Sequence, residues 1–215
     1  MIDAITYADM LKHIRNNELI EDTIGILITR PDLHTGNDIL KSLSYFHHLT
    51  GNNINFYLPG YGAYWSGDRY PDMDNVALIN GVEWSFSYKS FVDFIADIEE
   101  VSRWKYSGES ELLLIPYYDE MLDFSKAAVF HLDIMIDDGT ISSVSSFITG
   151  LSKCVRLDNS VTSIAARGAV KCMSKTAIDE MIDKMPTYIS KSLRRGKHYL
   201  CRDFSCKRER AILRG

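Results

Sequence analysis

The sequence predicts an α/β fold: a single domain with a mainly parallel central sheet flanked by helices, followed by a helical C-terminal third. The apolar, β-branched run at 23–29 is followed by a helical pattern and then by a second extended run at 54–58. This order is typical of a right-handed β-α-β unit, whose two strands are parallel. A hydrophobic fraction of 46% and a charged fraction of 25% are those of a globular protein, and 215 residues suit one core of this class.

Each element follows from apolar periodicity and from the residues that interrupt it. Pro31 ends the first strand, the polar run 35–38 can cap the next helix, and Gly51 terminates that helix. The glycine-, aromatic- and aspartate-rich stretch 60–75 predicts one long loop. We expect helices over 7–16, 39–50, 91–104, 143–155, 164–173 and 176–193, strands over 23–29, 54–58, 76–79 and 112–115, and either a strand or a helix over 127–136.

Composition also bounds where the chain works. No apolar run approaches the roughly 20 residues that cross a bilayer, and the N-terminus lacks the apolar block of a signal peptide. We therefore expect a cytoplasmic protein without a membrane partner. The four cysteines, Cys154, Cys172, Cys201 and Cys206, lack zinc-ligand spacing, which predicts reduced thiols and no metal site.

Charge divides the chain into two parts. Residues 191–215 hold nine Lys and Arg against two acidic residues, so this segment carries +7 while residues 1–190 carry −12. We expect an α/β domain over 1–190 and a basic C-terminal segment over 191–215 that docks on it or extends from it. The segment can bind an acidic protein surface, including a sister chain in a homo-oligomer, or a nucleic acid. Because aromatic residues are sparse there, protein docking is favoured over nucleic acid.

Two segments follow the first two predicted strands and would meet at the carboxyl edge of a parallel sheet, where ligands bind in α/β folds. Arg30 and Asp32 follow the first strand, and the alternative is a capped turn that pairs the two. The second segment offers glycine for close backbone approach and aromatic faces for stacking, unless it covers the core instead. Its candidate substrate-binding residues are Tyr61, Gly62, Tyr64 and Trp65.

A third segment reads Glu109-Ser110-Glu111 and continues through four apolar residues to Pro116. It resembles the glutamate motif of mono-ADP-ribosyltransferases, with Ser85-Phe86-Ser87 echoing the serine motif and Arg30 the early strand arginine. The resemblance implies that Glu111 stabilises oxocarbenium character at the nicotinamide ribose, that Glu109 orients the acceptor, and that Ser85 and Ser87 bind substrate. The alternative is a helix end followed by an edge strand with two solvated glutamates.

The order of elements, the aromatic-glycine loop and the string from Ser107 to Glu111 are similar to nucleoside deoxyribosyltransferase-like and Toll/interleukin-1-receptor-like domains. That resemblance implies a glutamate that cleaves N-ribosyl bonds, often of NAD, without a cofactor, and a role in bacterial antiviral defence. If all strands were parallel, however, Glu109 and Glu111 would lie at the beginning of their strand, at the edge of the sheet opposite Arg30. Either the sheet is not parallel there, or these glutamates are not the site.

The sequence therefore supports two hypotheses. The first is a metal-independent hydrolase or transferase that uses Glu111 to cleave an N-ribosyl bond of NAD, as a substrate, or of another nucleotide. The alternative is a non-catalytic binding subunit or sensor that acts through a protein or nucleic-acid partner. His131 and Asp133, which alternate with apolar residues, are interpreted as a solvated strand face rather than as part of either site.

The basic segment generates the first testable prediction. If residues 191–215 dock on an acidic protein surface, their deletion lowers the melting temperature or dissociates an oligomer, as measured by thermal unfolding and by mass in solution. If they bind DNA or RNA instead, deletion leaves both unchanged and removes a binding affinity that falls steeply with salt. The second result would overturn the preference for protein docking.

Overall fold

The computed structural model describes residues 2–4, 6–16, 21–50, 55–63, 70–79, 81–118, 121–151, 187, 190, 199–201 and 203–206. Its named elements are β1 (Ile2–Ala4), α1 (Tyr7–Asn16), β2 (Glu21–Ile28), α2 (His34–Thr50), β3 (Asn55–Pro59), β4 (Tyr61–Ala63), β5 (Met73–Ile79), β6 (Val82–Ser87), α3 (Tyr88–Val101), β7 (Glu111–Tyr118), β8 (Met121–Leu122), the 3-10 turn η1 (Phe124–Lys126), β9 (Ala128–His131), α4 (Leu132–Asp137) and β10 (Tyr199–Cys201). Residues 144–151 form a further helix.

The fold is mixed α/β, as predicted, but its central sheet is not mainly parallel. The strand order is β1-β3-β2-β7-β9-β10, with β8 paired to β7. Only β1, β3 and β2 run parallel to one another. The partners of β7 and β9 are all antiparallel, and the longest pairing, β2 with β7, runs over eight residues from Glu21↔Tyr118 to Ile28↔Glu111. The prediction of a mainly parallel sheet is therefore wrong.

The reversal has its origin in the segment 102–110, which joins α3 to β7. Ser102 forms an antiparallel β-bridge with Ser205. The backbone N–H of the neighbouring Phe204 donates to the carbonyl of Phe124, a residue that follows the C-terminal end of β7. At its other end Ser110 lies beside Thr29, with their hydroxyl oxygens 2.8 Å apart. After the helix, the chain thus returns along the sheet before β7 begins, so β7 starts where β2 ends. The alternation of helix and strand patterns in the sequence does not indicate that the chain crosses the length of the sheet once more between α3 and β7.

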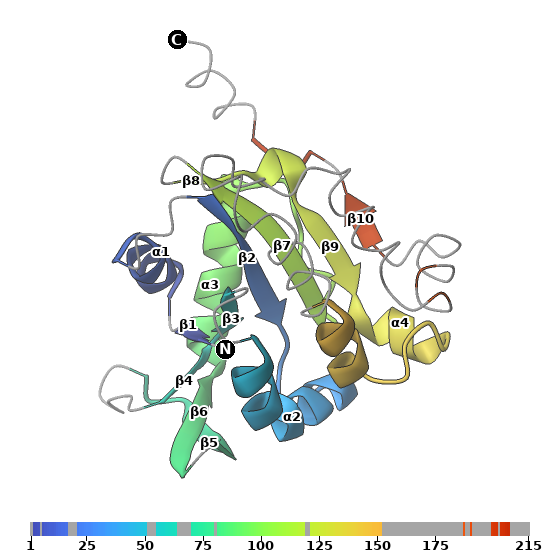
Figure 1. Cartoon of the computed structure of the whole chain (residues 1–215). Coiled ribbons are helices and arrows are strands. Elements are labelled where there is room, and N and C mark those ends of the chain that lie inside the picture. The colour runs from blue at the N-terminus through green and yellow to red at the C-terminus, as the bar shows by residue number, and fades with distance from the viewer. Residues whose placement is uncertain are drawn as a thin grey trace, which may run out of the picture.

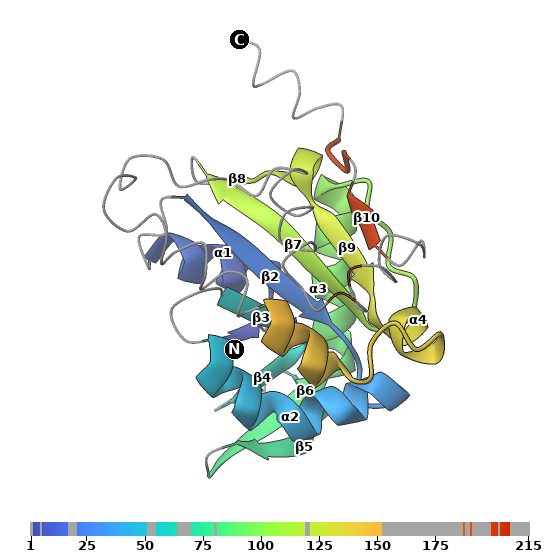
Figure 2. The same ribbon diagram turned by 45° about the vertical axis from the view of Figure 1, so that its right-hand side comes forward.

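Helices cover both faces of the central sheet (Figures 1 and 2). On one face α1 and α3 are joined by an edge-to-face contact of Tyr7 with Phe94. On the other face α2 lies beside helix 144–151, where the hydroxyls of Tyr45 and Thr149 are 3.1 Å apart. The central strands between these layers are buried at every described side chain from Thr23 to Thr29 and from Glu111 to Tyr117. The predicted β-α-β unit corresponds to β2, α2 and the parallel β3.

A second, antiparallel sheet has the order β4-β6-β5, and β4 and the start of β5 lie in the region predicted as one long loop. Gly60, with φ +78°, turns the chain from β3 into β4, and a Cβ there would lie 2.7 Å from Cβ of Phe91. Its carbonyl accepts the backbone N–H of Ser87, 3.0 Å away. This sheet thereby fixes the start of α3 against the end of β3.

The segment 127–136, which the sequence left open between strand and helix, is both, because β9 passes directly into α4 at His131. The C-terminal third predicted as helical lies mostly outside the described residues. Its described parts include helix 144–151 but also the strand β10, which extends the sheet antiparallel to β9. Beyond it Phe204 is only 2% exposed, and its backbone N–H donates to Phe124.

Within the described ranges we find no helix that combines the length and the apolarity needed to span a membrane.

The first turn of α2 predicts a sharp steric effect at Gly36. A Cβ added there would lie 1.8 Å from the carbonyl oxygen of Arg30, which is far inside van der Waals contact. We expect Gly36→Ala to destabilise the fold by about 1–3 kcal/mol because the backbone must shift. The matched control is Gly150→Ala, since Gly150 is also helical and has open space around it. That change should stabilise by about 0.5–1 kcal/mol, and equal melting temperatures for the two variants would contradict the packing described here.

Candidate functional site

The antiparallel pairing of β7 brings Glu111 to the carboxyl edge of β2. Glu111 lies directly opposite Ile28, and Arg30 follows two residues beyond the end of β2. Of the two alternatives that the sequence left open, the first is therefore correct: the sheet is not parallel at β7. Glu111 and Arg30 share one edge of the sheet.

Glu111 is a completely buried carboxylate, with 0% exposure. Its Oε2 accepts the indole N–H of Trp104 at 3.0 Å, and its Oε1 lies 3.1 Å from Nδ1 of His131 in an ion pair. Glu111 and His131 are direct cross-strand neighbours on β7 and β9, so both side chains leave the same face of the sheet. A buried carboxylate is costly unless it is paired and hydrogen-bonded, and these two partners meet that need.

His131 does not lie on a solvated strand face, contrary to its interpretation from the sequence. The contact with the Glu111 carboxylate raises the pKa of His131, although burial acts in the opposite direction and nearby Glu109 adds to the rise. Its side chain remains 18% exposed. Asp133, also assigned to that face, lies in α4 and accepts the backbone N–H of Ser110 at 2.6 Å. Burial raises the pKa of Asp133.

Two tyrosine hydroxyls lie close to these groups without a hydrogen-bond partner among the described residues. Tyr61 is 0% exposed, and burial raises the pKa of its hydroxyl well above the ordinary value. Burial also raises the pKa of Tyr106, to about 12, and Glu111 adds to the rise. Each tyrosine interacts electrostatically with the other and with Arg30. Tyr106 thus interacts electrostatically with both Glu111 and Arg30, and Tyr61 with Arg30.

Arg30 is held by two contacts at the surface end of this region. Its Nη2 lies 3.3 Å from the Asp32 carboxylate, and its Nη1 donates to the Tyr88 hydroxyl at 3.4 Å. Burial alone would lower the pKa of Arg30, but Asp32 and Tyr88 outweigh it and the pKa is raised. The pairing of Arg30 with Asp32 was the alternative to ligand binding, and it is present. Nε of Arg30, in contrast, is buried without a partner among the described residues.

These side chains form what we call the edge cluster: Arg30, Tyr61, Tyr106, Glu111 and His131. In the part of the chain that the structure describes, three buried polar atoms of the edge cluster have neither a hydrogen bond nor an ion pair: Nε of Arg30 and the hydroxyls of Tyr61 and Tyr106. Folded proteins pair nearly all such atoms, so a concentration of unpaired ones requires an explanation. A bound polar ligand would provide it.

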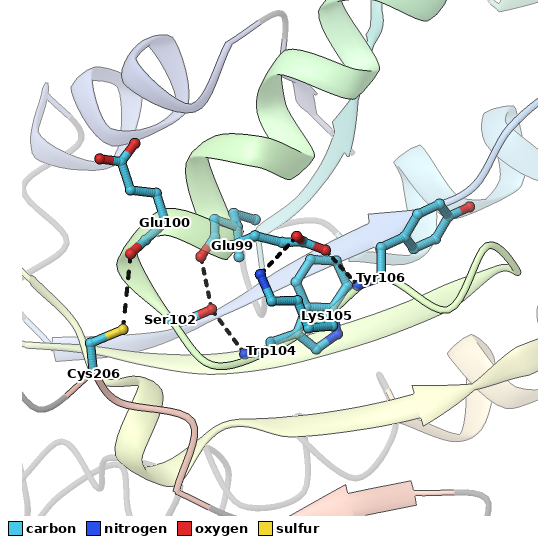
Figure 3. Close-up of polar contacts among 8 residues, drawn as sticks. Glu99, Glu100, Ser102, Trp104, Lys105, Tyr106 and Cys206 are labelled. Carbon is cyan, nitrogen blue, oxygen red and sulfur yellow. Dashed lines mark hydrogen bonds and ion pairs between the residues drawn. The ribbon is translucent and has the colours of Figure 1, made fainter.

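A compact hydrogen-bonded loop at the end of α3 positions two of the side chains around Glu111 (Figure 3). The Glu99 carboxylate accepts the backbone N–H of Tyr106 at 2.9 Å and the ammonium of Lys105 at 2.9 Å. The Ser102 hydroxyl donates to the carbonyl of Ile98 and accepts the backbone N–H of Trp104. Glu99 and Ser102 thereby fix the segment that carries Trp104 and Tyr106.

The remaining predicted site residues have other surroundings. Glu109 is exposed and reaches the cluster only through its electrostatic influence on His131. Ser85, which pairs with Gly62 across β6 and β4, donates to the Asn75 side chain at 2.7 Å. Ser87 caps α3 by accepting the N–H of Ser90 and donates to Asp72 at 2.8 Å. Tyr64 and Trp65 lie outside the described residues.

Four residues of this region were missed by sequence reasoning: Tyr88, Trp104, Tyr106 and His131. Trp104 and Tyr106 lie shortly before the segment that resembles the glutamate motif, so proximity to Glu111 in the chain was a usable signal. His131 becomes a neighbour of Glu111 only through the pairing of β9 with β7. No spacing in the sequence reveals that register.

Among the described residues, no group of three or more His, Cys, Asp or Glu side chains is arranged to hold a metal ion. Comparison with known protein families, with curated proteins and with solved structures finds no match to this chain.

The loop in Figure 3 yields a prediction with a built-in control. Burial acts to raise the pKa of Glu99, but donation from Tyr106 and Lys105 outweighs it and lowers the pKa. The resulting stability is present above the ordinary glutamate pKa of 4.5 and is lost as the pH falls through the lower folded value. At pH 7 we expect Glu99→Gln to cost about 1 kcal/mol in unfolding free energy.

The control for that variant is Glu100→Gln, which removes the same charge one residue later. Glu100 is exposed, and its side chain points away from the loop. Thermal unfolding of both variants and of the wild type should be followed between pH 7 and pH 3. The deficit of Glu99→Gln should shrink toward pH 3, whereas a pH-independent deficit, or one equal to that of Glu100→Gln, would contradict the role of Glu99.

Proposed function

We propose that this chain is a cytoplasmic, metal-independent enzyme that cleaves an N-ribosyl bond of NAD or of another nucleotide, with Glu111 as the catalytic carboxylate. The observation that carries the proposal is the edge cluster, in which a buried glutamate and an arginine lie at one edge of the sheet with two tyrosine hydroxyls that have no hydrogen-bond partner among the described residues. The resemblances of Glu109-Ser110-Glu111 to N-ribosyl-cleaving enzymes support the same chemistry, and the second of them extends the proposal to antiviral defence.

The chemistry requires a negative charge beside C1′ of the sugar. As the bond to the base breaks, positive charge develops at C1′, and a preoriented carboxylate in a dry site stabilises it more strongly than water does. Trp104 holds Oε2 of Glu111 at 3.0 Å, which fixes the orientation of the carboxylate before the reaction. No metal or cofactor is needed for this step, and NAD would enter as a substrate.

The other members of the cluster suit the rest of a nucleotide. The Arg30 guanidinium supplies a positive charge for phosphate oxygens, and Asp32, 65% exposed, is the partner that a phosphate would displace. The hydroxyls of Tyr61 and Tyr106 can bond ribose hydroxyls. Glu109 is exposed at the entrance to β7, where an acceptor for ADP-ribose would approach.

Access to Glu111 requires a local movement, because its carboxylate has no exposed area. Tyr106 is the side chain suited to move, since it is only partly buried and its hydroxyl has no hydrogen-bond partner among the described residues. Its ring packs edge-on against Phe91, at a centroid distance of 5.6 Å. Rotation of Tyr106 would open a path from the surface at Arg30 to the carboxylate.

The same burial favours a second candidate function. A glutamate fully enclosed by Trp104 and His131 also serves as a structural ion pair, and the chain would then be a non-catalytic binding subunit or sensor. The described part of the basic segment docks on its own domain, because Phe204 packs into the domain and β10 extends the sheet. A homo-oligomer or another protein partner is favoured over nucleic acid in that case.

The test compares Glu111→Gln with Glu100→Gln in the full chain. Gln keeps the size of Glu111 and its acceptor for Trp104 but removes the charge, so release of nicotinamide from NAD, or of the base from a nucleotide, should fall at least about 100-fold. Glu100→Gln should match the wild type. Circular dichroism and thermal unfolding confirm that both variants fold.

Unchanged turnover in a folded Glu111→Gln variant would remove Glu111 from the mechanism. If the wild type releases no base from NAD or from any nucleotide, alone or with a partner protein, the binding-subunit function replaces the enzymatic one.

A further inference from the structure

His131 is placed to exchange a proton beside the catalytic carboxylate. It stands at the end of β9, directly across from Glu111, and its Nδ1 faces Oε1 at 3.1 Å. Its side chain is 18% exposed, so the ring bridges between the enclosed carboxylate and the surface of the edge cluster. None of the described residues bonds its other nitrogen, Nε2, which is therefore the one that a substrate can meet.

We propose, on the basis of the N-ribosyl cleavage proposed above, that His131 is the general acid that protonates the departing base, and that the substrate is a nucleotide with a neutral purine or pyrimidine base rather than NAD. The geometry that points to this is the pairing of one carboxylate and one imidazole across adjacent strands, with the second imidazole nitrogen free for a ligand.

The two substrate classes differ in what their leaving groups need. Nicotinamide is bound to ribose as a cation and departs as a neutral molecule, so its departure needs no proton. A neutral purine or pyrimidine would depart as an anion unless an acid protonates a ring nitrogen. General acid catalysis of such a step contributes about 10²–10⁴-fold. An acid beside Glu111 is of use only to the second class.

The step balances as follows. The C1′–N bond breaks, its electron pair passes to the base nitrogen, and the proton on Nε2 of His131 moves to a ring nitrogen of the base. Water then adds to C1′ and returns a proton to Nε2, which gives ribose phosphate and a neutral free base. His131 keeps its Nδ1 proton toward Glu111 throughout, so no other reactant is required.

Charge within the pair favours this sequence. While His131 is protonated, its positive charge offsets the negative charge of Glu111 and stabilises the buried carboxylate in the resting protein. When Nε2 gives up its proton, the negative charge of Glu111 is no longer offset, at the moment when positive charge develops at C1′. The attraction between Glu111 and the sugar is therefore strongest in the transition state, which is the condition for catalysis.

The groups around His131 favour its protonated form. Glu111 faces it from β7 and Glu109 lies just before that strand, and both raise its pKa. Tyr106 and Asp133 lie in the same region, from the segment before β7 and from α4, and the pKa of each is itself raised. Cleavage of a neutral-base nucleotide should accordingly be fastest below the raised pKa of His131 and should decline as the pH rises through that pKa.

The experiment uses His131→Asn in the full chain, because the Asn side-chain nitrogen occupies the position of Nδ1 and preserves the contact with Glu111 while Nε2 is lost. Wild type, His131→Asn and Glu111→Gln are assayed for free base from AMP, GMP, CMP and UMP, from their 2′-deoxy forms, and from NAD. We expect His131→Asn to lower nucleotide cleavage about 10²–10⁴-fold and to abolish the decline at high pH.

The outcomes separate the two proposals. If Glu111→Gln is inactive but His131→Asn cleaves nucleotides at the wild-type rate with the wild-type pH profile, N-ribosyl cleavage stands and His131 is not its acid. Cleavage of NAD alone by the wild type likewise overturns the substrate class and leaves the proposed function intact. Absence of cleavage of every substrate by the wild type overturns both.

Discussion

The antiparallel pairing of β7 with β2 is the constraint on which the rest of the structure depends. Eight consecutive residue pairs join the two strands at the centre of the sheet, so neither can slip without exposing its apolar side chains. The register sets the start of β7 against the end of β2, and this alone brings Glu111 level with Arg30. The pairing of β9 with β7 then adds His131, and the loop fixed by Glu99 adds Trp104 and Tyr106.

A buried ion pair is an uncertain source of stability, since the cost of removing two charged groups from water offsets much of their attraction. The Glu111–His131 pair therefore calls for an explanation beyond packing, as do the nearby buried polar atoms that have no partner among the described residues. Perturbed ionisable groups of this kind are concentrated at functional sites. Structural pairs also exist, however, which is why charge removal at Glu111 and loss of Nε2 at His131 are the decisive comparisons.

The sequence was sufficient for features that depend on local chemistry. The periodicities of 7–16 and 23–29 predicted α1 and β2 closely, and Arg30 and Glu111 were both selected as candidates from their neighbours in the chain. Strand direction was not accessible, because an apolar run such as 112–115 reads the same in either orientation. His131 was misinterpreted for the same reason: alternation shows which side chains share a face of a strand but not which strand lies beside it. The prediction of one long loop over 60–75 was wrong in part, because the short β4 and the start of β5 carry too few apolar residues to be recognised as strands.

The β2–β7 register also has a consequence for how the chain acquires its structure. Residues 21–28 pair with residues 111–118, so a ribosome must extend the chain by some ninety residues before the centre of the sheet can close. Contacts of such high sequence separation slow folding, since loop closure must precede the interactions that reward it. Until then the edge of β2 that β7 covers stays unpaired. Because His131 joins Glu111 only through β9, any activity of this site is withheld from the cell until synthesis has passed β9.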